Sequence, residues 1–266
     1  MIKPVLIRGG GDLASGIALR LFRSGFKVVV IELPQPLAVR RKVSFAEAVY
    51  EGEIMVETVT GRLTEMEQVQ VVLDTGKIPV LIDPDASILL DMDFTAVVDA
   101  RLTKKESHPL TLDVPLQIGL GPGFHAGRTC HAVIETQRGH NLGRVIWEGP
   151  SLPNSGQPEG NPKRVLRAPV DGQVVCHTEI GAHLEEGELI AEVISRIDNH
   201  KYPITSPLKG VLRGMIHPGI QVTSGLKIGD VDPRDDPEFC FLVSDKALAV
   251  GGGVLEAILS KTIERA

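Results

Sequence analysis

The sequence predicts an α/β protein with a mostly parallel sheet in its first half, a β-rich second part and a C-terminal helix. Three observations predict this fold class. Apolar runs of strand length alternate with helical patterns over residues 5–99. A proline- and glycine-rich stretch follows at residues 149–162, where little side-chain surface can pack. Beyond it, glycines and a proline recur with a constant offset of 38 residues.

The first forty residues carry the clearest pattern. An apolar run over residues 5–8 ends in glycines, and apolar residues with helical spacing follow over residues 13–21. Gly25 ends this helix, and residues 27–33 form a β-branched run typical of a strand buried on both faces. A strand, a helix and a strand in this order predict a right-handed parallel crossover of the Rossmann type.

The alternation continues less clearly along the chain. Thr64 and Glu67 have the spacing of a capping box at the start of a helix. We expect helices over 45–50 and 64–74, strands over 53–59, 77–83 and 95–99, and short strands over 130–135 and 144–147. This order predicts an open, mostly parallel sheet with helices on both faces.

The predicted organisation has four parts: a Rossmann-like domain over residues 1–149, a linker over 150–163, a β-rich domain over 164–234 and a returning strand and helix over 235–266. The repeat predicts two similar β units packed face to face, with each glycine at a turn of positive φ. Its matching pairs are Pro169 and Pro207, Gly172 and Gly210, Gly181 and Gly219, and Gly187 and Gly225. In the last part, Ser244 is the expected N-cap, and Gly251–Gly253 interrupt the pattern before a helix over 254–264.

Composition excludes some classes of function. The net charge of -6 leaves no basic surplus for binding nucleic acid. No apolar run is long enough to span a membrane, and no signal peptide is recognised, so we expect a cytoplasmic protein. The three cysteines are far apart and predict neither a disulfide framework nor a metal site. A homo-oligomer is compatible with this composition, although no interface can be identified.

The strongest chemical motif is the run Arg8-Gly-Gly-Gly-Asp-Leu-Ala-Ser-Gly16. Glycines between a strand and a helix let backbone N–H groups approach a pyrophosphate at the positive end of the helix. The candidate ligand-binding residues are therefore Gly9, Gly10, Gly11, Asp12 and Ala14. The alternative is a tight turn required only by the packing of the helix on the sheet.

An acidic residue at the end of the second strand supports the ligand-binding interpretation. Glu32 lies where a carboxylate accepts hydrogen bonds from ribose hydroxyls, and its charge would repel a 2′-phosphate. This predicts NAD rather than NADP as a nicotinamide ligand. Arg40, Arg41 and Lys42 follow; they could reach another phosphate, but a solvated helix start is the favoured interpretation.

Polar residues also follow the later strands. Asp83 and Asp85 come after a buried strand, where they could contact a ligand or a metal, although turn and cap roles are favoured. The same alternatives apply to the residues that end the next strand, which are Asp99, Arg101, Lys104 and Lys105.

A second glycine-rich loop spans residues 119–127 and contains Gly121, Gly123 and His125. It is followed by four polar residues that could bind an anion or transfer protons, namely His131, Glu135, Arg138 and His140. The segment is either a second ligand surface or an irregular lid held by tight turns. The spacing of the histidines predicts no zinc site, and the sequence has neither a serine-hydrolase elbow nor a P-loop lysine.

Three segments resemble two known families. Ala168-Pro-Val-Asp-Gly172 and Ser206-Pro-Leu-Lys-Gly210 resemble the turn of lipoyl and biotinyl domains, which implies a barrel-sandwich fold. Asn199 stands at the register of that family's carrier lysine, and Lys201 is out of register, so no covalent lipoate or biotin is expected. Residues 225–234 resemble the C-terminal domain of succinylglutamate desuccinylase-like proteins, without a recognisable zinc-ligand set.

The whole chain resembles the YqeB-type accessory proteins of selenium-dependent molybdenum hydroxylases. The motifs that carry this are Ile7–Gly16, Gly119–Phe124, Val133–His140 with Leu142–Arg144, and Gly252–Glu256. The resemblance implies a role in maturing or supplying a molybdenum hydroxylase, and it assigns no catalytic residues.

Three hypotheses follow, and they leave open whether the protein is an enzyme. The first is a maturation factor that holds a dinucleotide, such as a molybdopterin dinucleotide, and docks on a partner molybdenum hydroxylase. The second is an NAD-dependent oxidoreductase, for which His125, His131 and His140 are the candidate proton donors. The third is a non-catalytic scaffold with a purely structural glycine turn.

Overall fold

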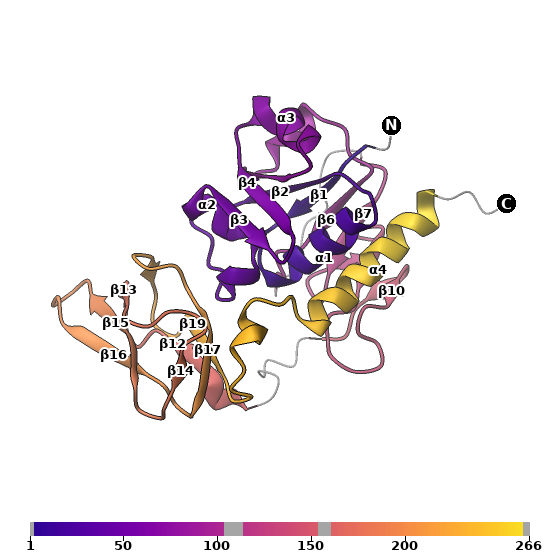
Figure 1. Ribbon diagram of the computed structural model, residues 1–266. Helices are drawn as coiled ribbons and strands as arrows, with labels where there is room; N and C mark the ends of the chain where they lie inside the picture. The colour runs from indigo at the N-terminus through magenta and orange to yellow at the C-terminus, as the bar shows by residue number, and fades with distance from the viewer. Residues whose placement is uncertain (1–2, 104–113, 154–160, 263–266) are drawn as a thin grey trace. The chain divides into compact units, whose positions relative to one another are not determined.

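The chain forms two compact units in a computed structural model that describes residues 3–103, 114–153 and 161–262 (Figure 1). Unit 1 comprises the described parts of residues 1–36, 44–155 and 243–266. Unit 2 comprises residues 37–43 and the described part of 156–242. Each unit is therefore assembled from segments that are distant in the sequence.

Unit 1 contains a nine-stranded mixed sheet with the order β10-β9-β7-β6-β1-β2-β5-β4-β3. The strands from β9 to β4 in this order run parallel, and β10 and β3 are antiparallel at the two edges. The strands are β1 (Val5–Arg8), β2 (Val28–Glu32), β3 (Glu53–Val56), β4 (Val59–Leu63), β5 (Ile78–Ile82), β6 (Ala96–Asp99), β7 (Gln117–Leu120), β9 (Ala132–Ile134) and β10 (Val145–Ile146). A separate ribbon pairs β8 (His125–Ala126) with β11 (Gly149–Pro150).

Four α-helices occur in the described residues, and all belong to unit 1: α1 (Asp12–Arg23), α2 (Ala48–Glu51), α3 (Val69–Asp74) and α4 (Asp245–Thr262). Figure 1 shows α4 running alongside α1. Their close approach depends on glycine, because a Cβ atom on Gly16 would lie 2.6 Å from the Cβ of Ala247. On the same interface, a Cβ on Gly251 would lie 2.9 Å from the carbonyl oxygen of Gly16.

Unit 2 contains two four-stranded antiparallel sheets, with the orders β12-β19-β17-β14 and β16-β15-β13-β18. The strands are β12 (Val165–Arg167), β13 (Gly172–Cys176), β14 (His183–Leu184), β15 (Leu189–Ser195), β16 (Lys201–Thr205), β17 (Gly210–Met215), β18 (Gln221–Val222) and β19 (Lys227–Asp232). Strands β13, β14 and β15 begin 38 residues before β17, β18 and β19.

The repeated glycines have two different physical roles. Gly181, Gly187, Gly219 and Gly225 have positive φ, as expected for turns. Gly172 and Gly210 instead begin strands, where a Cβ atom would collide with the carbonyl oxygen of Ile194 or Asp232. At this pair of positions glycine is required by close backbone approach, and the expected positive φ is wrong.

The predicted fold class, a Rossmann-like domain followed by a barrel-sandwich, is wrong as stated. The large sheet of unit 1 is mixed, and the described residues contain only four α-helices for many strands. Two of those helices have four and six residues, so they cannot cover a sheet face as full crossover helices do. Short 3₁₀ turns occupy much of the remaining connections, including Phe45–Glu47, Met66–Gln68 and Ser87–Leu90.

Three local predictions are also corrected. The single strand expected over 53–59 is an antiparallel hairpin of β3 and β4, with Glu57 at a φ of 52° in its turn. The expected capping box does not form, because α3 begins at Val69 after a 3₁₀ turn and has no side-chain cap. Gly251–Gly253 do not interrupt the last helix, which runs through them as α4.

Two further predictions concern the ends of elements. The hydroxyl of Ser244 accepts a hydrogen bond from the amide of Ala247 at 3.2 Å, which confirms it as a cap of α4. The predicted linker over 150–163 lies partly outside the described residues, as do Lys104 and Lys105. In the described part of the chain, no helix has the length and apolar character needed to cross a membrane.

Candidate ligand site at the carboxyl ends of the parallel strands

The parallel strands of unit 1 bring distant polar residues to one edge of the sheet. Their carboxyl ends share this edge because Arg8 of β1 is in register with both Ile31 of β2 and Asp99 of β6. The residues at or directly after the strand ends are Arg8, Glu32, Asp83, Asp99, Gly121 and Glu135. Ligands of parallel α/β sheets bind at such edges.

The predicted glycine turn connects β1 to α1, and its three glycines have different surroundings. Gly9 has a φ of +94°, which glycine adopts without strain. A Cβ atom on Gly10 would lie 2.8 Å from the amide nitrogen of Ala46, so this position is closed by protein. Gly11 is the N-cap residue with a φ of -64°, and a Cβ there would meet no atom within 4 Å. The turn is therefore open only on its Gly11 side.

The sequence does not predict the hydrogen bonds that support the turn from behind. Fully buried Ser15 donates a hydrogen bond to the carbonyl oxygen of Gly10 at 3.2 Å and accepts one from the amide of Phe45 at 2.8 Å. The amide of Ala46 donates to the same carbonyl at 2.9 Å. These contacts hold the turn rigid, and no sequence pattern links residue 15 to residues 45 and 46.

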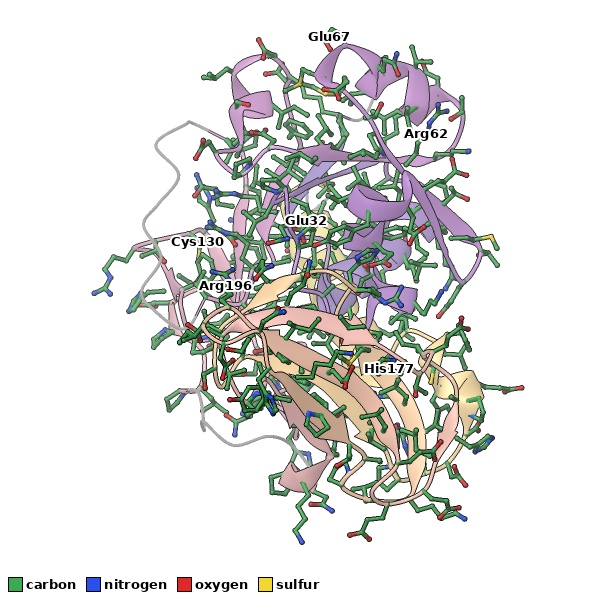
Figure 2. The ribbon with its side chains drawn as sticks, turned by 90° about the vertical axis from the view of Figure 1, so that its left-hand side faces the viewer. Glu32, Arg62, Glu67, Cys130, His177 and Arg196 are labelled. Carbon is green, nitrogen blue, oxygen red and sulfur yellow. The ribbon has the colours of Figure 1, made fainter. Side chains whose placement is uncertain are left out.

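Glu32 is bound to the backbone of the turn. The carboxylate of Glu32, a residue labelled in Figure 2, accepts hydrogen bonds from the amides of Gly10, at 2.6 Å, and Leu33, at 2.8 Å. Burial raises the pKa of Glu32, and these two hydrogen bonds oppose that shift. One amide that was expected to face a phosphate is thus occupied by a carboxylate.

Two arginines and one aspartate form a cluster at the end of β6, and Arg101 of this cluster lies beside Gly9 of the turn. Arg101 donates to both carboxylate oxygens of Asp99, at 2.9 and 2.5 Å, and Arg8 lies 3.4 Å from the same carboxylate. Burial, reinforced by the charge of Arg101, lowers the pKa of Arg8. The hydrogen bond to Asp99 raises the pKa of Arg101. The Arg101 side chain is 39% exposed, and its Cγ lies 3.5 Å from a Cβ built on Gly9.

The remaining acidic candidates at this edge have local roles. Asp83 is buried and accepts hydrogen bonds from the amides of Ser87 and Ile88, at 2.8 and 3.0 Å, and from the Ser87 hydroxyl. It therefore caps the 3₁₀ turn over Ser87–Leu90, as the favoured interpretation predicted. Asp85 is exposed, and Asp12 and Ala14 lie in the first turn of α1.

The second glycine loop follows β7 at the same edge, two strands from β1. Gly121 has a φ of +73°, and a Cβ there would lie 2.7 Å from the hydroxyl of Thr136. Gly123 is buried. His125 is held in its own turn, since its Nδ1 lies 2.9 Å from the carbonyl oxygen of Ala126. Tight turns thus shape this loop, with Gly121 positioned next to the β6 end.

The other polar residues of this segment have separate surroundings. The Nδ1 atom of His131 accepts a hydrogen bond from the Gln117 amide at 2.9 Å. Buried Glu135 accepts from the amides of Gln137 and Leu152, at 2.7 and 2.8 Å. Arg138 forms a bidentate pair with Asp245 at 2.6 and 2.8 Å, and His140 is exposed. In the described residues, His125 and His131 contact separate backbone groups, and His140 is exposed, so the three histidines form no common group.

The basic run after Glu32 belongs to unit 2 and contacts its backbone. Arg40 is buried and donates to the carbonyl oxygens of Phe239 and Leu242, at 3.0 and 2.9 Å. Arg41 donates to the carbonyl oxygen of Met215 at 3.2 Å. The interpretation of this run as a solvated helix start is therefore wrong for Arg40, which ties residues 37–43 into unit 2.

Comparisons with known proteins give one strong sequence similarity and weak structural ones. No protein-family model matches the chain. Solved structures of a succinylglutamate desuccinylase/aspartoacylase from Rhodobacter sphaeroides and a succinylglutamate desuccinylase from Silicibacter sp. TM1040 are similar at TM-scores of 0.25 and 0.28. Their sequence identities are 20% and 14%, over 33% and 86% of this chain and 29% and 84% of those chains. Similarity this weak carries no argument about function, and the predicted Rossmann and barrel-sandwich combination finds no support in it.

The strong sequence similarity is to a protein whose name states no activity. The chain is 45% identical over 273 residues to "Uncharacterized protein YqeB" of Escherichia coli strain K12. The match covers 97% of this chain and 49% of that protein, so the chain spans about half the length of this relative. Nearly the whole chain is thus similar to about half of the length of YqeB.

Proposed function

We propose that unit 1 binds an anionic ligand of the dinucleotide type and that the chain acts as an accessory factor for a molybdenum hydroxylase. The single observation that supports binding most directly is the side chain of Arg101, which is 39% exposed and lies beside Gly9 of the glycine turn. A helix N-terminus and an arginine together attract a phosphate group. The role in hydroxylase maturation is supported only by the sequence motifs that resemble the YqeB-type accessory proteins.

The acidic residues at the edge do not oppose an anion as strongly as their number suggests. Asp99 is neutralised by two arginines, and Asp83 is used as a cap. Glu32 receives two backbone hydrogen bonds, and burial raises its pKa. At the end of β6, two arginines thus pair with the single carboxylate of Asp99.

Substitution at Gly11 tests the binding of an anion. Asparagine and aspartate both fit at this position, because its φ is ordinary and its Cβ direction is empty, and both are favourable N-cap residues. Gly11→Asp adds a negative charge where the ligand phosphate would lie, whereas Gly11→Asn adds almost the same shape without the charge. In calorimetric titrations with NAD⁺, NADP⁺ and ADP, Gly11→Asp should weaken binding at least ~10-fold more than Gly11→Asn does.

A second pair of variants tests the role of Arg101. Arg234 forms the same bidentate pair with Asp232, two residues before it, at the end of β19 in unit 2. Arg101→Gln should weaken ligand binding, and Arg234→Gln should leave it unchanged. Equal effects of the two substitutions, or tight binding by Gly11→Asp, would contradict the proposal.

The accessory role needs a separate experiment in a host that makes molybdopterin. Native mass spectrometry of the purified protein should show a bound nucleotide, and the Gly11→Asp variant should fail to support hydroxylase maturation. Normal maturation with that variant would exclude the role of this site in it. Protein isolated without any nucleotide, and unable to bind one, would favour the scaffold hypothesis.

A further inference from the structure

Helix α4, which runs alongside α1 (Figure 1), has no polar face over most of its length. Between Ala247 and Leu259 its only polar side chain is that of Glu256. A helix that is apolar all round is normally buried all round. Four apolar residues of α4 are nevertheless partly exposed and recur every three or four positions. This outer stripe consists of Leu248, Gly252, Leu255 and Leu259.

The three consecutive glycines of α4 separate its covered faces from the outer stripe. A Cβ atom on Gly251 would lie 2.9 Å from the carbonyl oxygen of Gly16 in α1. On another face, a Cβ on Gly253 would collide with the carbonyl oxygen of Gly143. Gly252 points between these two faces and has no atom within 4 Å of its Cβ direction. Because glycine destabilises a helix interior relative to alanine, contacts among the described residues do not account for Gly252.

Two exposed charges flank the outer stripe on opposite sides. Arg20 of α1 donates from Nε to the carbonyl oxygen of Leu248 at 3.3 Å, on the side where Gly251 meets α1. Glu256 is exposed and lies about one helical turn after Gly252, turned toward the side of Gly253. The arginine and the glutamate therefore also lie on opposite sides of Gly252 along the helix axis.

We propose that α4 is a dimerisation helix, on which a second copy of the chain packs its own α4 in antiparallel orientation around a two-fold axis at Gly252. Each Gly252 then admits the helix of the other copy, as Gly16 admits α4 within one copy. The same axis brings Arg20 of each copy to Glu256 of the other copy. This charge complementarity is what favours a second copy as the occupant of the outer stripe. The dimer requires no ligand, so it can fail without the proposed function.

Sedimentation equilibrium between about 1 μM and about 500 μM tests the dimer, because an interface of one helix per copy is small and its association weak. The wild-type chain should form dimers that dissociate on dilution. Gly252→Leu should raise Kd at least ~30-fold, because the added side chain overpacks a symmetric interface twice. Arg20→Glu should raise Kd ~10-fold through repulsion from Glu256, and the double variant Arg20→Glu/Glu256→Arg should restore the wild-type value.

Arg167→Glu is the matched control, because Arg167 is an exposed arginine of unit 2 that also donates to a backbone carbonyl, that of Gly225 at 2.8 Å. This variant should leave Kd unchanged within a factor of ~2. Thermal melting in dilute solution, where the chain is monomeric, shows that each variant still folds. A wild-type chain that stays monomeric over the whole range would overturn the proposal. Dimers that tolerate Gly252→Leu, or that the double charge reversal does not restore, would overturn it as well.

Discussion

Individual glycines in this protein are required for different physical reasons, and only local geometry separates them. In α4, Gly252 has no atom within 4 Å of its Cβ direction, whereas a Cβ on Gly253 would collide with the carbonyl oxygen of Gly143. The two residues are adjacent in one continuous helix. Their sequence context is nearly identical, so the difference arises only from what packs against each face of the helix.

Alanine substitutions in α4 should therefore have opposite effects. Gly252→Ala should stabilise the protein by about 1 kcal/mol, because alanine loses less backbone entropy in a helix and meets open space. Gly253→Ala should destabilise it by roughly 1–3 kcal/mol through overpacking against a backbone atom. Calorimetric melting of both variants measures this, and a higher melting temperature for Gly253→Ala would contradict the described packing.

The hydrogen bonds of Ser15 behind the glycine turn predict that the protein loses stability when this hydroxyl is removed. Ser15→Ala leaves the buried amide of Phe45 without its 2.8 Å acceptor, which should cost about 1–3 kcal/mol of unfolding free energy. Ser260→Ala, which removes a hydroxyl that donates to a carbonyl within the same helix, is the control and should cost less than about 0.5 kcal/mol. Equal costs in a denaturant titration would mean that the Ser15 contact is unimportant.

In unit 2, two carboxylates of strand β19 lie among arginines from neighbouring segments. Asp230 is fully buried and pairs with Arg164 at 2.8 and 3.0 Å and also with Arg213. Asp232 pairs with Arg234 and lies 3.3 Å from Arg213. Arg213 stands where the β17–β19 pairing shifts register, and such a bulge redirects a side chain.

This arrangement predicts a dependence of stability on pH. Burial alone would raise the pKa of Asp232, but the Arg234 hydrogen bonds and the Arg213 charge outweigh it and lower the pKa to about 2. A carboxylate with a lowered pKa in the folded state stabilises the fold at higher pH, and this stabilisation is lost as the pH falls from about 4 to about 2. Melting temperatures should thus fall less over this range in Asp232→Asn than in wild type. A matched exposed variant, Glu186→Gln, should follow the wild-type curve.

The sequence predicts elements with strong periodicity and misses those set by tertiary contacts. The first strand, helix and strand lie within a few residues of their predicted positions, because buried β-branched runs and helical spacing of apolar residues leave few alternatives. The sequence predicts one strand where the β3–β4 hairpin forms, since the turn of this hairpin has Glu57 at positive φ and lacks the Gly or Asn that marks such turns. The strand-end positions of the site follow from such patterns. The Ser15–Phe45 and Arg101–Asp99 contacts require the folded backbone.

For the whole molecule, residues 37–43 are a short excursion from unit 1 that completes unit 2. Val39 packs on Gly214, where a Cβ would lie 2.7 Å from the Val39 carbonyl oxygen. Arg40 holds the carbonyl groups of Phe239 and Leu242. Unit 2 therefore depends on a peptide made long before its own strands.

Removal of the Arg40 side chain should expose this dependence. Arg40→Ala should destabilise unit 2 by about 2–3 kcal/mol, because two carbonyl groups lose a charged donor. Hydrogen exchange should then become faster over residues 237–242. Arg196→Ala, which removes an exposed side chain bonded to Gln221, should leave exchange there unchanged. Unaltered exchange in the Arg40 variant would show that other contacts hold the segment.

The contact between α1 and α4 has a consequence for how the protein is made. The face of α1 around Gly16 is covered by Ala247 and Gly251, which are translated about 230 residues later. At ordinary rates of translation that face waits on the order of ten seconds or more for its cover. During this interval the face of α1 around Gly16 lacks the helix α4 that packs on it. Premature termination before residue 245 should thus yield a nascent chain that is a target for chaperones and proteases.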